Sequence, residues 1–160
     1  MKPTVLKGFG FGVTSGVVTT LGLIVGLHSG THSKLAVVGG IVVLAVADAL
    51  SDAMGVHVSE EAEGEHSHKE VWEATVFTFL AKFVFTLSFV PLVLMLEAQS
   101  AVLASVAWGL FLITLLSLAT ARGMGQNPVK AAAEHVLLTI AVVVLAHYAG
   151  EMIYEFFSGP

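Results

Sequence analysis

Two carboxylates, Asp48 and Asp52, stand within an otherwise apolar stretch of the chain. They are four residues apart, so in a helix both project from one face, about one turn apart. A carboxylate at the middle of a bilayer costs at least about 2.5 kcal/mol, and a bound cation or shared protons would offset that cost. We therefore expect at least one of them, with Ser51 beside it, to serve an ion path. The alternatives are that both reach water at a helix end, or that one pairs with Lys82.

An acidic segment rich in histidine follows at about residues 56–70, with Glu73 just beyond it. Carboxylate oxygen and imidazole nitrogen together form a ligand set for divalent Fe, Mn, Co, Ni and Zn. Two Glu-x-x-His pairs in this segment have the spacing seen in ferritin-like di-iron sites. A solvated charged loop is the alternative, but the histidine enrichment favours metal capture. The predicted ligands are His57, Glu60, Glu61, Glu63, Glu65, His66 and His68.

Further polar side chains lie near the ends of other apolar segments. Glu134 and His135 start the last segment, where they either join a site or anchor the helix at the membrane surface. His147 lies deeper in the last segment. It either carries protons or, in the interpretation that we favour, forms a hydrogen bond with a neighbouring helix. His28 and His32 end the first segment, where they assist metal release or, as we expect, only occupy the surface.

The elements that must position these residues are membrane helices. Of the 160 residues, 56% are hydrophobic and only 12% are charged, about half the charged fraction of a typical soluble domain. A hydrocarbon core about 30 Å thick needs about 20 mostly apolar residues per helix, and open strands could not satisfy their backbone in lipid. We predict an all-α integral membrane protein with a single domain over residues 1–160. Its five expected helices are 9–28, 35–55, 71–96, with a kink at Pro91, 101–121 and 131–154.

The distribution of lysine and arginine predicts the orientation of these helices. Five of the seven basic residues fall on the side of the N-terminus, Lys82 lies inside the third helix, and only Lys34 falls on the opposite side. We therefore expect the N-terminus and the acidic loop in the cytosol. The first segment has no small-residue cleavage site, so we expect a retained helix rather than a signal peptide.

Glycines repeat at every fourth residue of the first helix. Small residues at this spacing allow helix backbones to approach closely in lipid. The pattern predicts either a seam between two subunits, or a narrow path, or packing against a helix of the same chain. The glycines concerned are Gly8, Gly12, Gly16, Gly22 and Gly26.

Several function classes lack support in the sequence. There is no cysteine, which excludes disulfides and thiolate metal sites. There is no HExxH, Walker-type or GxSxG motif, so we expect no enzyme, and any uphill transport must use an ion gradient. No basic patch with interleaved aromatics is present, so nucleic acid is not an expected partner.

Three stretches resemble the vacuolar iron transporter family of five-helix Fe/Mn exporters. Residues 12–26 read GVTSGVVTTLGLIVG, residues 47–59 read ADALSDAMGVHVS, and residues 125–128 read GQNP. They are similar to the family's Asn-Asp-Gly-Leu-Val-Ser-Thr, Gly-Ala-Leu-Ser-Met-Ala and Gly-Asn-Pro patterns, and they cover most of the chain in order. Ser15 stands where the family has an aspartate, Asp52 where it has a methionine, Val56 where it has a glutamate and His57 where it has a tyrosine. The cytosolic region is shorter than the family's metal-binding domain.

The resemblance implies a homodimer in which metal crosses between the first and second helices at the seam and is exchanged for protons. We expect the chain to export Fe²⁺ or Mn²⁺, as transported ion and not as cofactor, through a cell membrane or a vacuolar-type membrane. The acidic loop would gather the ion, and Asp48 and Asp52 would receive it. Neutral oxygens along the path would come from Thr14, Ser15, Thr19 and Ser51.

Two other functions are compatible with the same residues. The first is a membrane metal-binding or sensor protein that does not transport, in which the loop is the working part. The second is a membrane-embedded di-metal enzyme that uses the Glu-x-x-His pairs. We rank the enzyme last because its ligands crowd into one short loop.

Overall fold

The computed structural model describes residues 2–158, and every regular element among them is helical. Five continuous helical stretches are long and apolar enough to cross a membrane, as the composition predicted. Three of them are single helices. The second contains a π-helical segment, and the third is interrupted before residue 90. In chain order the elements are α1 Pro3–Thr31, α2 Lys34–Val43, η1 Leu44–Asp48, α3 Ala49–Glu63, α4 His68–Leu87, α5 Val90–Met95, α6 Ala98–Gly123 and α7 Pro128–Ser158.

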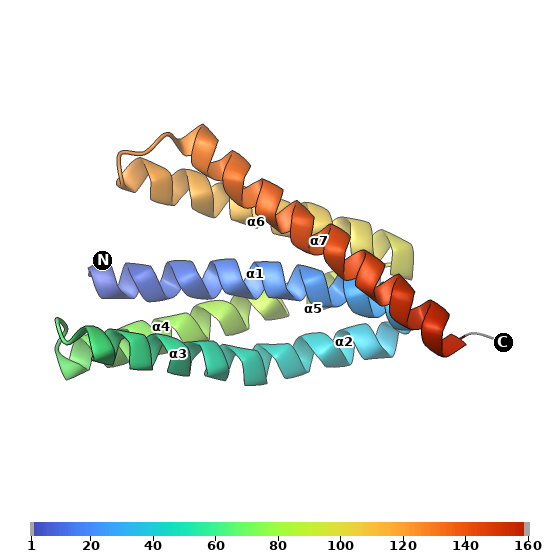
Figure 1. Ribbon diagram of the computed structural model, residues 1–160, viewed down its shortest axis with the longest axis horizontal. Coiled ribbons are helices and arrows are strands. Elements are labelled where there is room, and N and C mark those ends of the chain that lie inside the picture. The colour runs from blue at the N-terminus through green and yellow to red at the C-terminus, as the bar shows by residue number, and fades with distance from the viewer. Residues whose placement is uncertain (1, 159–160) are drawn as a thin grey trace.

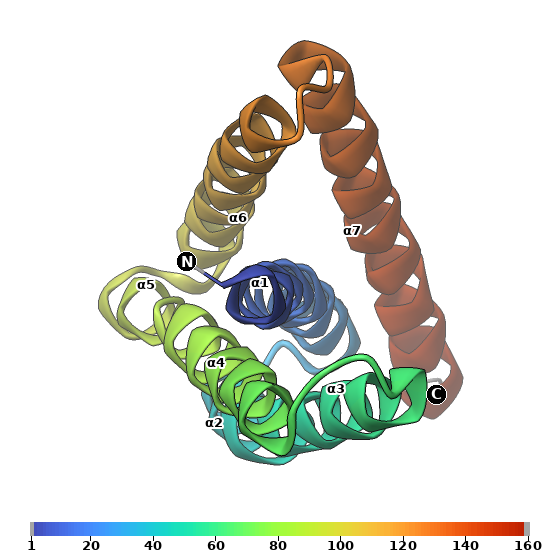
Figure 2. The ribbon, with the colours of Figure 1, turned by 90° about the vertical axis from the view of Figure 1, so that its left-hand side faces the viewer.

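Helix α1 forms the centre of the bundle, and the other helices surround it (Figure 2). The continuous helix of α2, η1 and α3 lies with α4 on one side of α1, and α6 and α7 lie on the other (Figure 1). The core follows from this arrangement, because Val17, Leu21 and Ile24 of α1 are fully buried and pack with Ile41 and Ile113. One end of the bundle carries the start of α1 and the α3–α4 and α6–α7 connections, and we call it the Glu60 end.

The second membrane helix differs from the prediction at its C-terminal end. We expected it to end at residue 55 and a loop to cover residues 56–70, but α3 continues to Glu63 and α4 begins at His68. The loop prediction was therefore wrong for most of its length. Gly64 ends α3 in the left-handed conformation at φ 68°, and Ser67 with Glu70 forms a capping box that starts α4. Glutamate and alanine are good helix formers, so hydrophilicity alone did not indicate a loop.

A π-helical segment, η1, lies in the middle of the same helix and ends at Asp48. Such segments widen one turn of an α-helix and are frequent at functional sites. The kink expected at Pro91 is confirmed, since α4 ends at Leu87 and a new helix, α5, starts at Val90. Pro91 has no backbone N–H to donate to the carbonyl of Leu87, four residues earlier, which is where α4 ends.

The repeated glycines of α1 pack against helices of the same chain. A Cβ at Gly8 would lie 2.4 Å from the backbone oxygen of Ala74, and one at Gly12 would lie 2.5 Å from that of Thr78, both on α4. Gly16 also faces α4, whereas Gly22 and Gly26 face α7. The glycine spacing was compatible with a subunit seam, a narrow path or packing within the chain. At these five positions the structure shows packing within the chain.

This contact predicts a sharp difference between two alanine substitutions on one helix. Gly8→Ala is expected to lower the free energy of unfolding by about 1–3 kcal/mol, because the new methyl group overlaps the α4 backbone. Gly10→Ala is the matched control, since nothing lies within 4 Å of a Cβ at that position. Unfolding of both variants in mixed detergent micelles measures the difference, and equal stabilities would contradict the close contact.

Candidate functional site

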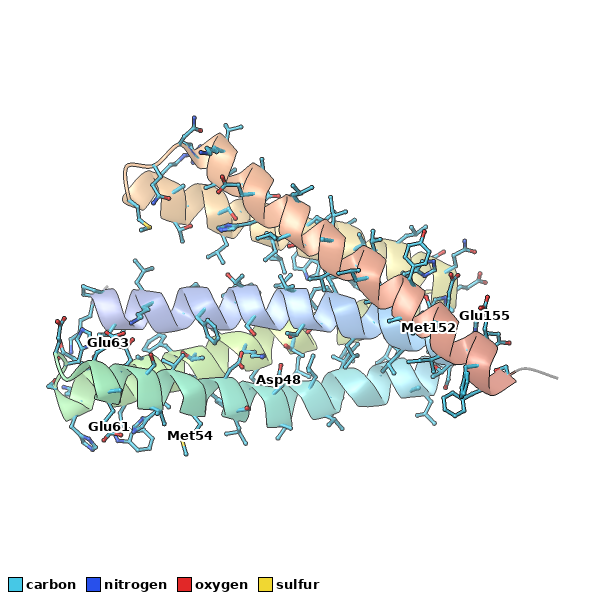
Figure 3. The ribbon with its side chains drawn as sticks, in the orientation of Figure 1. Asp48, Met54, Glu61, Glu63, Met152 and Glu155 are labelled. Carbon is cyan, nitrogen blue, oxygen red and sulfur yellow. The ribbon has the colours of Figure 1, made fainter. Side chains whose placement is uncertain are left out.

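The centre of the site is a lysine between the two predicted aspartates. Lys82 of α4 is fully buried, and its Nζ forms ion pairs with Oδ2 of Asp48 and, at 2.5 Å, with Oδ2 of Asp52. Ser15 of α1 completes the group, because its hydroxyl donates to Asp52 at 2.6 Å and accepts from Lys82 at 3.0 Å. Asp48 lies near the middle of the length of the bundle (Figure 3). We call Ser15, Asp48, Asp52 and Lys82 the charged group.

The structure thus confirms that both aspartates share one face of their helix. It also shows that both, and not only one, pair with Lys82. An ion that reaches these carboxylates must therefore compete with the lysine ammonium for them. If all three side chains are ionised, the two carboxylates outnumber the single ammonium by one charge. A proton or a cation can balance that remaining charge.

Close packing of α1 on α4 brings these side chains together. Gly16 lies against the backbone of Lys82, and a Cβ there would be 3.1 Å from the Lys82 carbonyl oxygen. One turn further along, Thr20 donates to the carbonyl of Gly16, and its hydroxyl oxygen lies 3.2 Å from that of Thr86. With no side chain on this glycine, the lysine can lie alongside α1 and extend to the aspartates of η1 and α3.

A groove runs along α3 from the charged group toward the Glu60 end of the bundle. Its volume is about 490 Å³, and α1 supplies one wall while α3 supplies the other. Asp52 lines the inner part beside Ser51, and Glu60 lies about two turns further along α3. The groove residues are Lys7, Phe11, Ser51, Asp52, Gly55, Val56, Ser59 and Glu60.

Three of the predicted metal ligands meet at the outer end of this groove. Glu60, Glu63 and His66 each place a ligand atom within 4.8 Å of the others, and we call them the outer cluster. Glu60 is 1% exposed, and its two oxygens lie 2.6 Å from Lys7 Nζ and 2.9 Å from His66 Nδ1. Lys7 also donates to Glu63 at 3.0 Å. Two carboxylates and one imidazole are a ligand set for a divalent transition metal ion.

The other predicted ligands do not join the outer cluster. Glu61 projects to the opposite side of α3 from Glu63 (Figure 3), and Glu65 is exposed. His57 makes a 2.9 Å hydrogen bond with Thr75, and His68 accepts one from the indole nitrogen of Trp72 at 3.1 Å. These two histidines contact the Trp72 ring instead of the carboxylates.

A second cavity lies on the other side of Ser15. It has a volume of about 340 Å³ between α1, α6 and α7, and the predicted path residues Thr14, Ser15 and Thr19 line it together with His135. Thr19 donates to the carbonyl of Ser15, and His135 lies 2.8 Å from the hydroxyl of Ser117. The Ser15–Asp52 hydrogen bond therefore stands between the groove and this second cavity.

The sequence did not indicate the roles of two cations or the position of one irregular segment. Pairing of Lys82 with one aspartate is among the alternatives that the sequence offers, but its contact with both is not, and Lys7 gives only a signal for topology. A lysine inside an apolar stretch is itself a signal, since such a residue in a membrane helix marks a functional site and has a partner. The π-helical turn at Asp48 has no signal in the sequence.

We compared the chain with known proteins by sequence and by structure. No family model matches it, and neither a curated protein nor a solved structure does.

Proposed function

We propose that this chain transports a divalent metal ion, Fe²⁺ or Mn²⁺, across a membrane in exchange for protons. The observation that carries the proposal is the position of Asp52, which lies in the charged group and also lines the groove that begins at Glu60. One surface therefore connects a candidate metal cluster at the end of the bundle with carboxylates at its middle.

The outer cluster is where the ion would enter. Glu60 is buried although its carboxylate oxygens make only ion-pair contacts, without hydrogen bonds of good geometry. A buried carboxylate in that condition is costly unless a cation compensates it. Lys7 supplies that charge in the structure, and a metal ion bound to Glu60, Glu63 and His66 would replace it.

The charged group is where the ion would pass the middle of the membrane. Buried ion pairs are often no more stable than apolar residues of the same size, so their presence in a small membrane protein favours a functional role. Lys82 would neutralise the carboxylates while no ion is bound and give them up when one arrives. The carboxylate charge in excess of Lys82 would take up a proton as the metal leaves, since metal binding and protonation compete for the same oxygens.

Orientation and assembly complete the proposal. The end that holds the outer cluster would face the cytosol, because it also carries most of the lysine and arginine. The chain would act as a homodimer in the cell membrane or a vacuolar-type membrane, as the resemblance to vacuolar iron transporters implies. Transport would then export the metal from the cytosol.

Uptake of metal into proteoliposomes with an imposed pH gradient tests the proposal, with Fe²⁺, Mn²⁺, Co²⁺ and Zn²⁺ compared in parallel. We expect saturable uptake that the proton gradient accelerates, together with proton movement in the opposite direction. Metal binding without flux in sealed vesicles would instead identify a membrane metal-binding protein that does not transport.

The same assay tests the outer cluster through a matched pair of substitutions. Glu60→Gln is expected to raise the half-saturating metal concentration about tenfold or more, since loss of a ligand or its support typically costs 10–100-fold in affinity. Glu61→Gln removes the adjacent exposed carboxylate, which lies on the other side of α3, and is expected to leave uptake unchanged. The same effect in both variants would contradict entry at Glu60.

A further inference from the structure

The end of the bundle opposite the outer cluster contains a second group of metal-ligating side chains. A cavity of about 430 Å³ between the C-terminal parts of α1 and α7 is lined by three histidines and two glutamates. We propose that His28, His32, His147 and Glu151 form a binding site for a divalent transition metal ion of the Zn²⁺, Fe²⁺ or Co²⁺ class. This proposal goes beyond the proposed function, because binding here does not require transport.

Each helix contributes two of the four side chains at a spacing suited to one metal ion. His28 and His32 are four residues apart at the end of α1, and His147 and Glu151 are four apart on α7. Ligands at this spacing lie on one face of a helix, the arrangement with which pairs of histidines hold zinc. The imidazole rings of His28 and His32 have their centres 5.7 Å apart, and His147 Nε2 lies 3.3 Å from Glu151 Oε1.

Glycine contacts hold the two helices close enough for both pairs to reach the same cavity. A Cβ at Gly150 of α7 would lie 2.4 Å from the carbonyl oxygen of Gly26, and one at Gly30 would lie 3.3 Å from that of Gly150. The backbones of α1 and α7 therefore touch beside the cavity. This contact fixes the relative position of the two ligand pairs without any metal present.

Ser29 orients His147 in the way that metal-binding histidines are usually oriented. Ser29 is buried at 7% exposure, and its hydroxyl lies 2.7 Å from His147 Nδ1. Histidine ligands generally donate their second ring N–H to such an oxygen, which fixes the ring and leaves the other nitrogen free for the metal. The Ser29 contact is compatible with either tautomer of His147. Without a metal, Nε2–H can donate to the Glu151 carboxylate 3.3 Å away, whereas in the tautomer with Nδ1–H donating to Ser29, Nε2 would turn its lone pair toward that carboxylate. A cation between these two acceptors would satisfy both.

His32 adds an unusual backbone conformation to the same place. It is the only non-glycine residue with positive φ among residues 2–158, at φ 52°. Residues other than glycine are uncommon in this left-handed backbone conformation, and those that adopt it are frequent at functional sites. His32 ends α1 there, and its ring lies against the cavity residue Tyr154 with ring centres 4.7 Å apart. No three of the four proposed ligands place their ligand atoms within 4.8 Å of one another in the structure, so binding requires the histidine rings to turn toward a common ion in the cavity.

Titration with Co²⁺ tests this site separately from the outer cluster. The full-length protein, without a histidine tag, is purified in detergent in a Glu60→Gln/Glu63→Gln/His66→Ala/Asp52→Asn background, which removes ligands of both the outer cluster and the charged group, and bound Co²⁺ is followed by visible absorption. We expect one Co²⁺ per chain, at least tenfold weaker binding after His28→Ala/His147→Ala, and the same direction of change after the single substitution His32→Asn. Because His32 is exposed, that variant remains informative if the double variant does not fold.

The matched control is His135→Ala, which removes a histidine of the same helix that lies outside this cavity. Binding should be unchanged in this variant. No Co²⁺ binding in the background protein, or unchanged binding in both the His32→Asn and the double variant, would overturn the proposal. Because the assay contains no membrane gradient, its result does not depend on whether the chain transports metal, and failed transport would leave this site untouched.

Discussion

Asp52→Asn is expected to abolish metal flux in proteoliposomes while leaving the protein folded and the outer cluster intact. Asp52 contacts Lys82 and Ser15 and also lines the groove that leads to Glu60. Asparagine preserves the shape of the side chain but removes the charge that a divalent ion needs at the middle of the membrane. An unbalanced cation there is costly, so loss of this one carboxylate should stop the ion at the inner end of the groove.

The readout that distinguishes a transport defect from misfolding is the combination of flux, elution volume in detergent and metal binding. We expect normal elution, retained binding at Glu60 and Glu63, and no uptake. Glu65→Gln provides the control, because this carboxylate is exposed and lies in the connection between α3 and α4. Wild-type flux in Asp52→Asn would remove this residue from the mechanism.

Lys82→Met is expected to lower the free energy of unfolding by about 3–5 kcal/mol, the usual cost of removing one partner from a buried ion pair. Methionine fills the space of the lysine side chain but leaves the carboxylates of Asp48 and Asp52 close together without their shared cation. Lys82 is fully buried, but Asp48 and Asp52 keep 32% and 21% of their side chains exposed, so water replaces the missing charge in part and the loss should fall near the lower end of this range. Unfolding in mixed micelles measures the loss.

A triple variant separates the effect of charge from that of packing. Asp48→Asn/Asp52→Asn/Lys82→Met contains no uncompensated charge in the group, and it should recover most of the stability lost in Lys82→Met. If the triple variant were as unstable as Lys82→Met, the loss would come from packing of the lysine stem instead. A Lys82→Met protein as stable as the original would contradict the ion pairing itself.

The sequence predicted the five membrane helices because long apolar blocks leave the backbone no other satisfied structure in lipid. It also predicted that Asp48 and Asp52 share a face, since that depends only on helical spacing. It did not predict that Lys82 contacts both of them. The contact depends on the depth and rotation of α4 relative to the helix of η1 and α3, which the spacing of residues does not give. Gly12 and Gly16 add a second constraint, because their backbone contacts place α4 against α1.

In the acidic segment the sequence contains the residues that mark the ends of the two helices. Its hydrophilic composition nevertheless led to the prediction of a loop. Ser67 and Glu70 are three residues apart, which is the pattern of a capping box, and the structure contains that box. Gly64 has the residue type that most often ends a helix. Reading these two signals would have shortened the predicted loop to the few residues between them. Which of Glu60, Glu61 and Glu63 face the groove then follows from helical rotation.

Helix α3 has an inner face made almost entirely of small or charged residues, and this affects how the protein can move. Its buried residues are only Ala49, Ala53 and Glu60. Small residues allow helix backbones to approach closely in lipid. The ion pairs of Glu60 with Lys7 of α1 and of Asp52 with Lys82 of α4 add electrostatic attraction between α3 and these neighbours. If the chain transports metal as proposed, an ion that competes for these carboxylates would weaken this attraction and loosen the helix, so that occupancy and opening would be coupled by the same side chains.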